Sequence, residues 1–283
     1  MAGTDNVDDD ALYVLTAVLL TPAQFPTVLG DDYPAACASL GLEAYAEGYG
    51  LVLGQDGTGA RWTVVVDDVS LVAVAIASWD CGMAYDLSPD ERSVVAGLPG
   101  WPLAVATAAP DLPAPHDPEP EEGDPPVLAP LDAGEWGPAQ RRMGADAIAL
   151  QWEAWRAEFD GSSGDKPAEG AAQDVAGDGQ AGDAGAWDPE AGDDPYDGVR
   201  RALAELRGYL KEPPPVGRVR STFATADARM LRADGPGWSL VARTDDMAFV
   251  LLDDEPREVL PVARGPKLPA LLEALDAMAV RPS

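Results

Sequence analysis

The sequence predicts an α+β (mixed α/β) fold made of two similar α/β halves, each a small, largely antiparallel sheet with flanking helices. Two observations carry this prediction. Apolar runs of strand length and runs of helical periodicity occur together at 10–109 and again at 199–283. A glycine-rich segment of the first block also has a counterpart in the second.

Composition separates these two blocks from the rest of the chain. Residues 110–136 are dense in Pro and acidic residues, which favours an extended linker. Residues 160–198 hold eleven acidic residues against one lysine and almost no large apolar side chain, which predicts a disordered linker. We expect 1–9 to be a disordered N-terminus and 137–159 to be a Trp-rich amphipathic helix.

The first block begins with an apolar run, 12–20, that fits either a helix capped by Asp10 or a buried strand. Thr21 followed by Pro22 predicts a helix start, because a capping side chain and a first-turn proline both suit a helix N-terminus. A further short helix is expected at 34–42.

The remainder of the first block is predicted to be mostly strand. The run 69–77 is short and almost uninterruptedly apolar, which favours a strand covered on both faces. Ser88 and Glu91 have the spacing of a capping box and predict a helix through Val94 and Val95. The strands expected in this block are 49–53, 61–66, 69–77 and 101–107.

The second block has a similar outline. Residues 199–210 are predicted to form a helix, because their apolar residues recur every three or four positions. The same pattern predicts a last helix at 268–278. The strands expected in this block are 219–225, 239–243, 247–252 and 259–263.

The glycine-rich segment LGQDGTGARWTVVVDD at 53–68 resembles LRADGPGWSLVARTDD at 231–246. Both contain Leu, an Asp-Gly pair, a second Gly, one Trp, an apolar run and a closing Asp-Asp. Each predicts a hairpin that follows a helix and precedes an apolar strand. An internal duplication explains the match, and so does chance, since Asp-Gly turns between apolar strands are common.

The charge balance disfavours two classes of partner. The chain has 49 acidic and 19 basic residues, a formal net charge of −30. Such a surface repels phosphate backbones and anionic lipid, so we expect neither nucleic-acid nor membrane binding. Solubility alone also explains the charge, and an acidic surface that mimics nucleic acid toward another protein stays open.

The two cysteines, Cys37 and Cys81, are not in a CxxC pair and are too few for a disulfide scaffold. We expect reduced, mostly buried thiols in a cytoplasmic protein. The apolar run 12–20 follows acidic rather than basic residues, so it does not predict an export signal. It is also too short to span a bilayer.

Most familiar catalytic motifs are missing. Gly57–Gly59 is followed by no Gly-Lys-Ser/Thr and opens no GxGxxG helix, so it predicts a turn rather than a phosphate loop, and we expect no cofactor. The chain's one histidine, His116, lies in the expected linker, which leaves no partner for a nucleophile and no nitrogen ligands for zinc. We therefore assign no catalytic residue and no metal ligand.

A polar site remains conceivable at Asp80, Cys81 and Asp86, which follow the expected strand 69–77. Strand ends in α/β proteins often carry functional side chains. The structural alternative is that Cys81 is a small buried hydrophobe and that the aspartates occupy turns. Adjacent aspartates such as Asp67 and Asp68 point to opposite faces of a strand and form no site alone.

The segment 137–159 is the strongest indication of a binding function. Its large apolar side chains recur every three or four residues and form one helical stripe. The stripe either docks on one of the two blocks and completes a core, or binds another chain, since Trp is favoured at binding hot spots. The candidate partner-binding residues are Ile148, Trp152, Trp155 and Phe159.

These observations favour a soluble, non-enzymatic protein-interaction protein with a regulatory, adaptor or escort-like (chaperone-like) role. Its partner would be a protein that contacts sheet edges or the Trp-rich helix. The alternative is a carboxylate-based enzyme or divalent-cation-binding protein with a site near Asp80 and Asp86.

Overall fold

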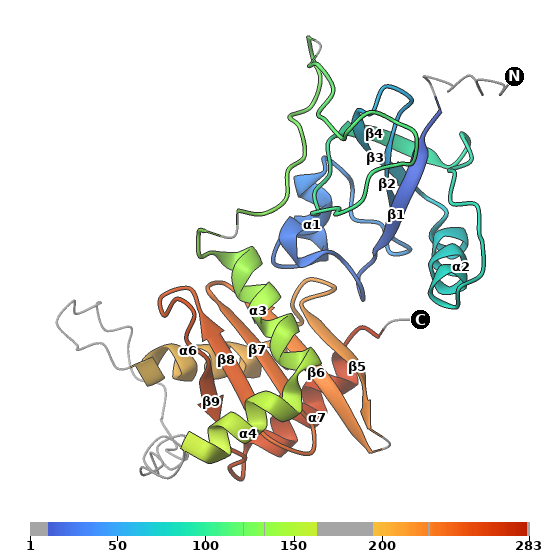
Figure 1. Cartoon of the computed structure of the whole chain (residues 1–283). Helices are drawn as coiled ribbons and strands as arrows, with labels where there is room; N and C mark the ends of the chain where they lie inside the picture. Colours follow the sequence, from blue (N-terminus) through green and yellow to red (C-terminus); the bar gives the residue numbers. More distant parts are fainter. Residues whose placement is uncertain (1–10, 121, 133, 163–194, 226, 282–283) are drawn as a thin grey trace, which may run out of the picture. The chain divides into compact units, whose positions relative to one another are not determined.

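The computed structural model describes residues 11–120, 122–132, 134–162, 195–225 and 227–281 (Figure 1). The chain divides into two compact units, which we call unit 1 and unit 2. The boundary between them in the sequence lies between Gly134 and Glu135. Each unit contains one antiparallel sheet with flanking helices, and the two sheets are similar in size. The predicted α+β class is therefore confirmed. Residues 1–9 and most of 160–198 lie outside the described residues.

The sheet of unit 1 has four strands that follow one another in sequence order. Helix α1 and the short 3-10 helix η1 lie on one face of this sheet, and α2 lies on the other. Tyr33 of α1 packs with Leu51 on the first face, whereas Val72 of α2 packs with Val52 on the second. The elements are β1 (Tyr13–Leu20), η1 (Thr27–Leu29), α1 (Tyr33–Ser39), β2 (Tyr49–Gln55), β3 (Arg61–Val66), α2 (Val69–Asp80) and β4 (Val94–Pro99).

Helix α2 corrects the predicted strand at 69–77. The Asp68 side chain accepts a hydrogen bond from the Leu71 N–H and caps the helix. Val72, Ala75 and Ser78, which are three residues apart, are then buried on one side of the helix, as a period of about 3.6 residues predicts. The prediction was wrong because an unbroken apolar run has no periodicity that distinguishes helix from strand.

Three other predictions in unit 1 also need correction. Residues 88–90 have no regular structure and 91–93 form a turn, because the Asp90 side chain accepts a hydrogen bond from the Arg92 N–H just before β4 begins. Thr21 forms a turn with Gln24, and no helix begins there. No strand is present at 101–107.

The expected linker 110–136 contributes to unit 1 as far as residue 134. Gln55 of β2 accepts a hydrogen bond from the Ala109 N–H at 2.7 Å and donates one to the Pro113 carbonyl at 3.4 Å. Farther along, the Leu128 N–H donates to the Pro99 carbonyl at the end of β4. These residues therefore pack against the sheet and do not act as a free spacer.

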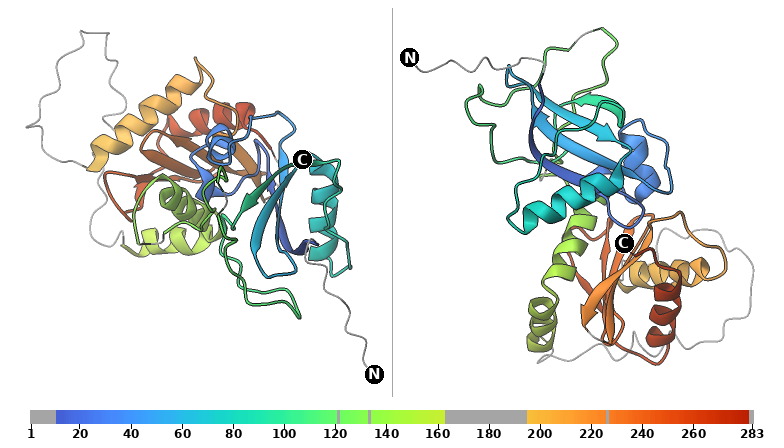
Figure 2. Two further views of the ribbon diagram at one scale, coloured as in Figure 1. Left: turned by 90° about the horizontal axis from the view of Figure 1, so that it is seen from above. Right: turned by 90° about the vertical axis from the view of Figure 1, so that its right-hand side faces the viewer.

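Unit 2 has a five-stranded sheet in sequence order with helices on both faces (Figure 2). Helices α3 and α4 cover one face, and α6 and α7 cover the other. The predicted helices and strands of the second block are confirmed, and β6 is the first strand of the hairpin predicted at 231–246, although no bounds were predicted for it. The elements are α3 (Pro138–Leu150), α4 (Trp152–Ser162), α6 (Pro195–Tyr209), β5 (Val219–Thr225), β6 (Ala228–Gly235), β7 (Trp238–Arg243), β8 (Ala248–Leu252), β9 (Leu260–Val262) and α7 (Leu268–Met278).

Both predicted hairpins are present, as β2–β3 and β6–β7. Their connections differ, because residues 56–60 join the first pair whereas only Pro236 and Gly237 join the second. The expected flanks are wrong on two counts. The first hairpin is followed by helix α2, and the second is preceded by strand β5. The duplication itself stays a prediction.

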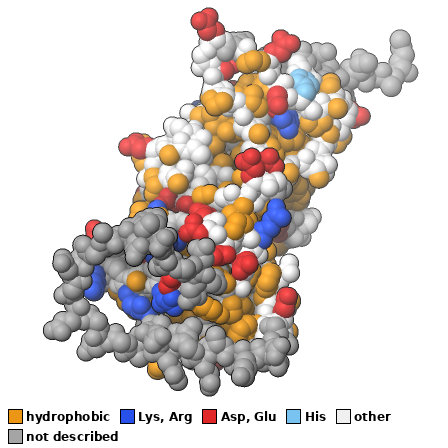
Figure 3. Space-filling view, turned by 90° about the vertical axis from the view of Figure 1, so that its left-hand side faces the viewer, with side chains coloured by type: hydrophobic (Ala, Val, Ile, Leu, Met, Phe, Trp, Pro, Cys, Tyr) orange, Lys and Arg blue, Asp and Glu red, His pale blue; other side chains and the backbone are white. Residues whose placement is uncertain are grey.

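Two surface features bear on possible partners. Within the part of the chain that the structure describes, every helix is too short or too polar to cross a membrane. On the face of the molecule shown in Figure 3, Asp and Glu side chains lie in several separate places and not in one patch. A localised site must therefore be sought from the residues that line a cavity.

Candidate functional site

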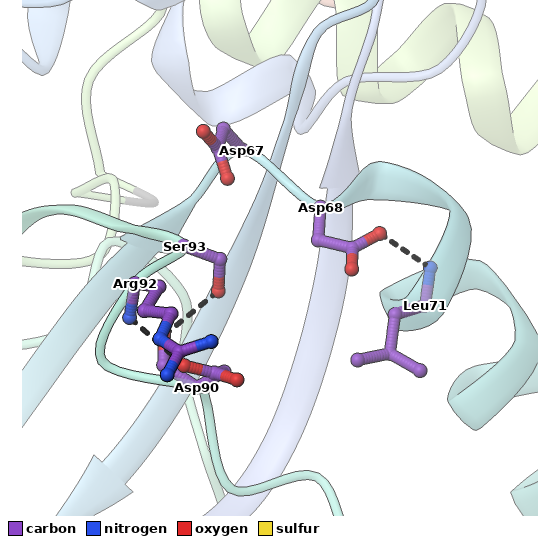
Figure 4. Close-up of a pocket in the computed structure, with 6 residues that line it drawn as sticks. All are labelled: Asp67, Asp68, Leu71, Asp90, Arg92 and Ser93. Carbon is purple, nitrogen blue, oxygen red and sulfur yellow. Dashed lines mark hydrogen bonds between the residues drawn. The ribbon is translucent and has the colours of Figure 1, made fainter.

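An open pocket of about 470 Å³ lies between the start of α2 and the turn that precedes β4 (Figure 4). A narrow cavity of about 20 Å³ adjoins it between α2 and residues 86–90. We call both together the α2 crevice. The pocket is lined by Asp67, Asp68, Leu71, Asp90, Arg92 and Ser93. The narrow cavity adds the apolar side chains Val52, Val66, Val72, Ala75 and Leu87 and the rim residue Asp86.

Three carboxylates on the rim of the crevice are held in place by local backbone N–H groups. Each accepts its backbone hydrogen bond through the Oδ1 atom, so the Oδ2 atom takes no part in that bond. The hydrogen bond from the Ser88 N–H also holds the pKa of Asp86 below its usual range. The bonds run from Leu71 N to Asp68 at 3.0 Å, from Ser88 N to Asp86 at 2.9 Å and from Arg92 N to Asp90 at 2.9 Å.

The carboxylates come from two sides of the crevice. Figure 4 shows Asp68 and Leu71 on the helix side and Asp90, Arg92 and Ser93 on the opposite side. Among the described residues, no group of three His, Cys, Asp or Glu side chains is arranged to hold a metal ion.

The outward side of α2 is apolar as well as the inward side. Val72 and Ala75 are buried against the sheet, whereas Leu71 and Val74 are 45% and 54% exposed. In the right-hand view of Figure 2, α2 lies in front of the sheet of unit 1 with its outward side toward the viewer. A surface helix usually has a polar outer face, so this face is unusual.

Further exposed apolar side chains lie at the end of α2 and in the residues that follow it in the chain. Seven of the thirteen large apolar side chains exposed in the described residues fall between 71 and 95, a small part of the chain. We call these seven the α2 surface. They are Leu71, Val74, Trp79, Met83, Tyr85, Val94 and Val95. Exposed apolar side chains that adjoin one another mark interaction sites in many proteins.

The structure places the residues of the predicted polar site at the end of α2 and in the segment that follows it. Asp80 and Cys81 lie exposed at the C-terminal end of α2, whereas Asp86 lies on the rim of the crevice. They do not follow a strand, because 69–80 is a helix. Cys81 is exposed and not buried as expected, whereas Cys37 is buried in the core, and both cysteines are free.

The Trp-rich segment packs on the sheet of unit 2. Ile148 and Trp152 are 1% and 4% exposed, and the Trp152 ring meets the Phe249 ring edge to face at 5.3 Å. Trp155 and Phe159 are partly buried against the same cluster. Of the two arrangements considered for this segment, the structure thus has the one in which it docks on a block and completes a core. Among the described residues, the surface that covers Ile148 and Trp152 therefore comes from unit 2 itself.

Unit 2 contains a buried arginine cluster that was not predicted. The guanidinium groups of Arg141, Arg142, Arg220 and Arg232 lie on the sheet face that α3 covers. At its centre is Asp234, fully buried, whose Oδ2 lies 3.3 Å from Nη2 of Arg142 and 3.8 Å from Nη2 of Arg220. The Ser239 hydroxyl donates to Asp234 Oδ1 at 2.7 Å. Arg141 and Arg232 pair with the partly exposed carboxylates Asp253 and Asp146.

The charges of this cluster shift pKa values in opposite senses for acid and base. Burial alone would raise the pKa of Asp234, but Arg142, Arg220 and Arg232 hold it below its usual range. Burial, followed by repulsion from Arg142, lowers the pKa of Arg220 to about 10. The reason is that several guanidinium groups surround the Asp234 carboxylate, whereas Arg220 is itself buried beside other guanidinium groups.

One sequence signal could have revealed the cluster. Arg220 lies in the predicted strand 219–225, and the strand register places Arg232 of β6 directly opposite it. Like charges in such a pair destabilise a sheet unless a carboxylate lies between them. Asp234, two residues along β6 from Arg232, is that carboxylate.

Comparison of the chain with protein-family models, with curated proteins and with solved structures finds no match. The functional inference must therefore come from the chemistry of these two regions.

Proposed function

We propose that the chain is a non-enzymatic protein-interaction protein, with a regulatory, adaptor or escort-like role, and that the α2 surface of unit 1 contacts its partner. The observation that carries this proposal is that α2 is apolar on both sides, whereas the residues that the structure describes cover one side only. Val72 faces the sheet at 7% exposure, whereas Val74 is 54% exposed. Covering such a face with a partner removes apolar area from water.

The other chemistry of the chain fits a protein partner. The net charge of −30 disfavours nucleic acid and anionic membranes as partners. The free cysteines Cys37 and Cys81 fit a reducing compartment, so we place the interaction in the cytoplasm.

Affinity capture from the native host tests this proposal. The bait is the full chain, compared with the double variant Leu71→Ser/Val74→Ser. Both side chains are exposed, so the variant should lose no more than about 0.5 kcal/mol of unfolding free energy. We expect it to lose proteins that the unchanged chain retains, as identified by mass spectrometry.

A matched control comes from unit 2. Leu150 and Phe223 are 86% and 71% exposed, and neither belongs to the α2 surface. The variant Leu150→Ser/Phe223→Ser should retain the same proteins as the unchanged chain. Loss of the same proteins from both double variants, or from neither, contradicts the assignment of the α2 surface.

The cation-binding alternative near Asp80 and Asp86 makes a separate prediction. A specific divalent ion would raise the melting temperature through mass action, and Asp86→Asn would abolish that rise. We expect no such rise with Mg²⁺, Ca²⁺ or Mn²⁺, because no described group of three ligands is arranged for it.

A further inference from the structure

We propose that the occupant of the α2 crevice is a segment of another protein in which Lys or Arg alternates with apolar residues. This inference rests on the proposed function, and it specifies the chemistry of the partner. It is carried by an apolar floor, a rim of oriented carboxylates and the charge of the chain itself.

The floor of the crevice takes apolar side chains. Val52 and Val66 come from the sheet, Leu71 and Ala75 from α2, and Leu87 from the segment opposite. Val52, Val66 and Ala75 are buried between α2 and the sheet, so the apolar surface that a partner can reach comes from Leu71, which is 45% exposed, and from the partly buried Leu87. Covering these side chains would remove apolar area from water. The exposed Leu71 continues this apolar lining out to the pocket.

The rim takes cations. Asp68, Asp86 and Asp90 each use Oδ1 for a local backbone N–H, so their orientation is fixed before any partner arrives. The remaining oxygen of each carboxylate retains lone pairs for an ammonium or guanidinium group. A preorganised acceptor loses little conformational entropy when it binds. Arg92 is the one cation lining the pocket, against the carboxylates of Asp67, Asp68 and Asp90.

The acidic charge also disfavours two other kinds of occupant, which are a second copy of the chain and the chain's own acidic segments. A second copy of the chain would bring a second net charge of −30 to an acidic rim. The chain's own segment 163–194 contains nine acidic residues and one lysine, and 1–10 contains four aspartates and no basic residue. Repulsion disfavours all of these in the crevice, whereas a basic partner is attracted to it.

Fluorescence anisotropy with defined peptides tests the proposal on the full chain. The probe is a fluorescein-labelled peptide of alternating Leu and Lys. Its two controls replace Lys by Glu, which reverses the charge, or Leu by Ser, which removes the apolar side chains. We expect the Leu-Lys peptide to bind at least about tenfold more tightly than either control, because it alone satisfies floor and rim.

A charge variant locates the binding. Asp68→Asn/Asp90→Asn removes two rim charges but keeps the side-chain oxygen that caps each turn, so the chain should fold normally. It should weaken binding of the Leu-Lys peptide about fivefold. Glu119→Gln/Glu122→Gln removes two charges from exposed positions of unit 1 outside the crevice and should change binding less than twofold. If circular dichroism shows a folding defect in the first variant, Asp67→Asn/Asp90→Asn replaces it.

Several outcomes would overturn the proposal. Equal binding of the Leu-Lys and Leu-Glu peptides would show that the rim carboxylates select nothing. Equal weakening by both pairs of charge substitutions would show diffuse attraction to an acidic chain. A rise in melting temperature with Mg²⁺ or Ca²⁺ that Asp68→Asn/Asp90→Asn abolishes would assign the rim to a cation instead. If the Leu-Lys peptide fails while Leu71→Ser/Val74→Ser still loses a host partner, the proposed function stands and the basic partner is wrong.

Discussion

Asp56 and Asp234 hold matching places in the two similar segments, and the folded chain uses them differently. Asp56 organises a turn at the surface: its Oδ1 accepts hydrogen bonds from the N–H groups of Thr58 and Ala60, and its Oδ2 accepts one from the Trp62 indole. Asp234 lies in a strand, fully buried, and faces arginines instead. The difference shows that a shared Asp-Gly motif specifies a hairpin but not what its carboxylate contacts.

The two units differ in the same way. In unit 2 both faces of the sheet are covered, and the charges of the arginine cluster are enclosed beneath α3. In unit 1 one helix of twelve residues lies on the second face, apolar side chains stay exposed on it, and the carboxylates line an open crevice. Unit 2 therefore encloses the charges of its arginine cluster, whereas the carboxylates of the α2 crevice in unit 1 face solvent.

The largest expected effect is on the buried carboxylate. Asp234→Ala removes the buried negative charge that lies beside Arg142 and Arg220 and should cost about 3–5 kcal/mol of unfolding free energy. Ser239→Ala removes one hydrogen bond to the same carboxylate and should cost about 1 kcal/mol. Urea unfolding of the full chain measures both, and equal costs would show that the charge of Asp234 is not what matters.

The next effect compares a covered helix with an uncovered one. Trp152→Ala should cost about 3 kcal/mol, because Trp152 is packed against Phe249 and almost fully buried. Val74→Ala on α2 should change the unfolding free energy by no more than about 0.5 kcal/mol, because Val74 is largely exposed. Chemical denaturation followed by circular dichroism gives both values. A Trp152→Ala variant as stable as the unchanged chain would mean that α4 is not part of the core.

A smaller effect is expected at the turn of the first hairpin. Asp56→Ala removes the acceptor for two backbone N–H groups and the Trp62 indole, which should cost about 1–2 kcal/mol. Asp56→Asn keeps one acceptor oxygen and should cost less. Thermal unfolding of both variants beside Asp234→Ala would rank the two aspartates. If Asp56→Ala costs as much as Asp234→Ala, the contrast between turn and cluster fails.

The smallest effect concerns pH. His116 lies beside the same turn, and its contacts with the carbonyl oxygens of Asp117 and Thr58 raise its pKa above the usual value. A raised pKa in the folded state adds stability that is full below the unfolded value of about 6.5 and is lost as pH rises through the folded value. The difference in melting temperature between the unchanged chain and His116→Gln should therefore shrink from pH 5.5 to pH 8.5. An NMR titration that places the pKa of His116 below about 6.5 would contradict this prediction.

Local pattern and composition determined much of this protein. The α+β class, both hairpins and the helices at 195–209 and 268–278 follow from turn residues and from apolar periodicity, which act over a few residues. The acidic charge is a property of composition alone. The expected Trp-rich helix is also present, although it divides at Gln151 into α3 and α4.

Tertiary structure decided the rest, because those features depend on neighbours that are distant in the chain. The run at 69–80 has apolar residues at almost every position, so only its packing on Val52 and Val66 shows which period it follows. The pairing of β5 with β6 brings Arg220 beside Arg232, and α3 adds Arg142 to enclose Asp234. The rim of the α2 crevice likewise contains Asp68 and Asp90, which are distant in the sequence. Long-range packing brings both to the same crevice.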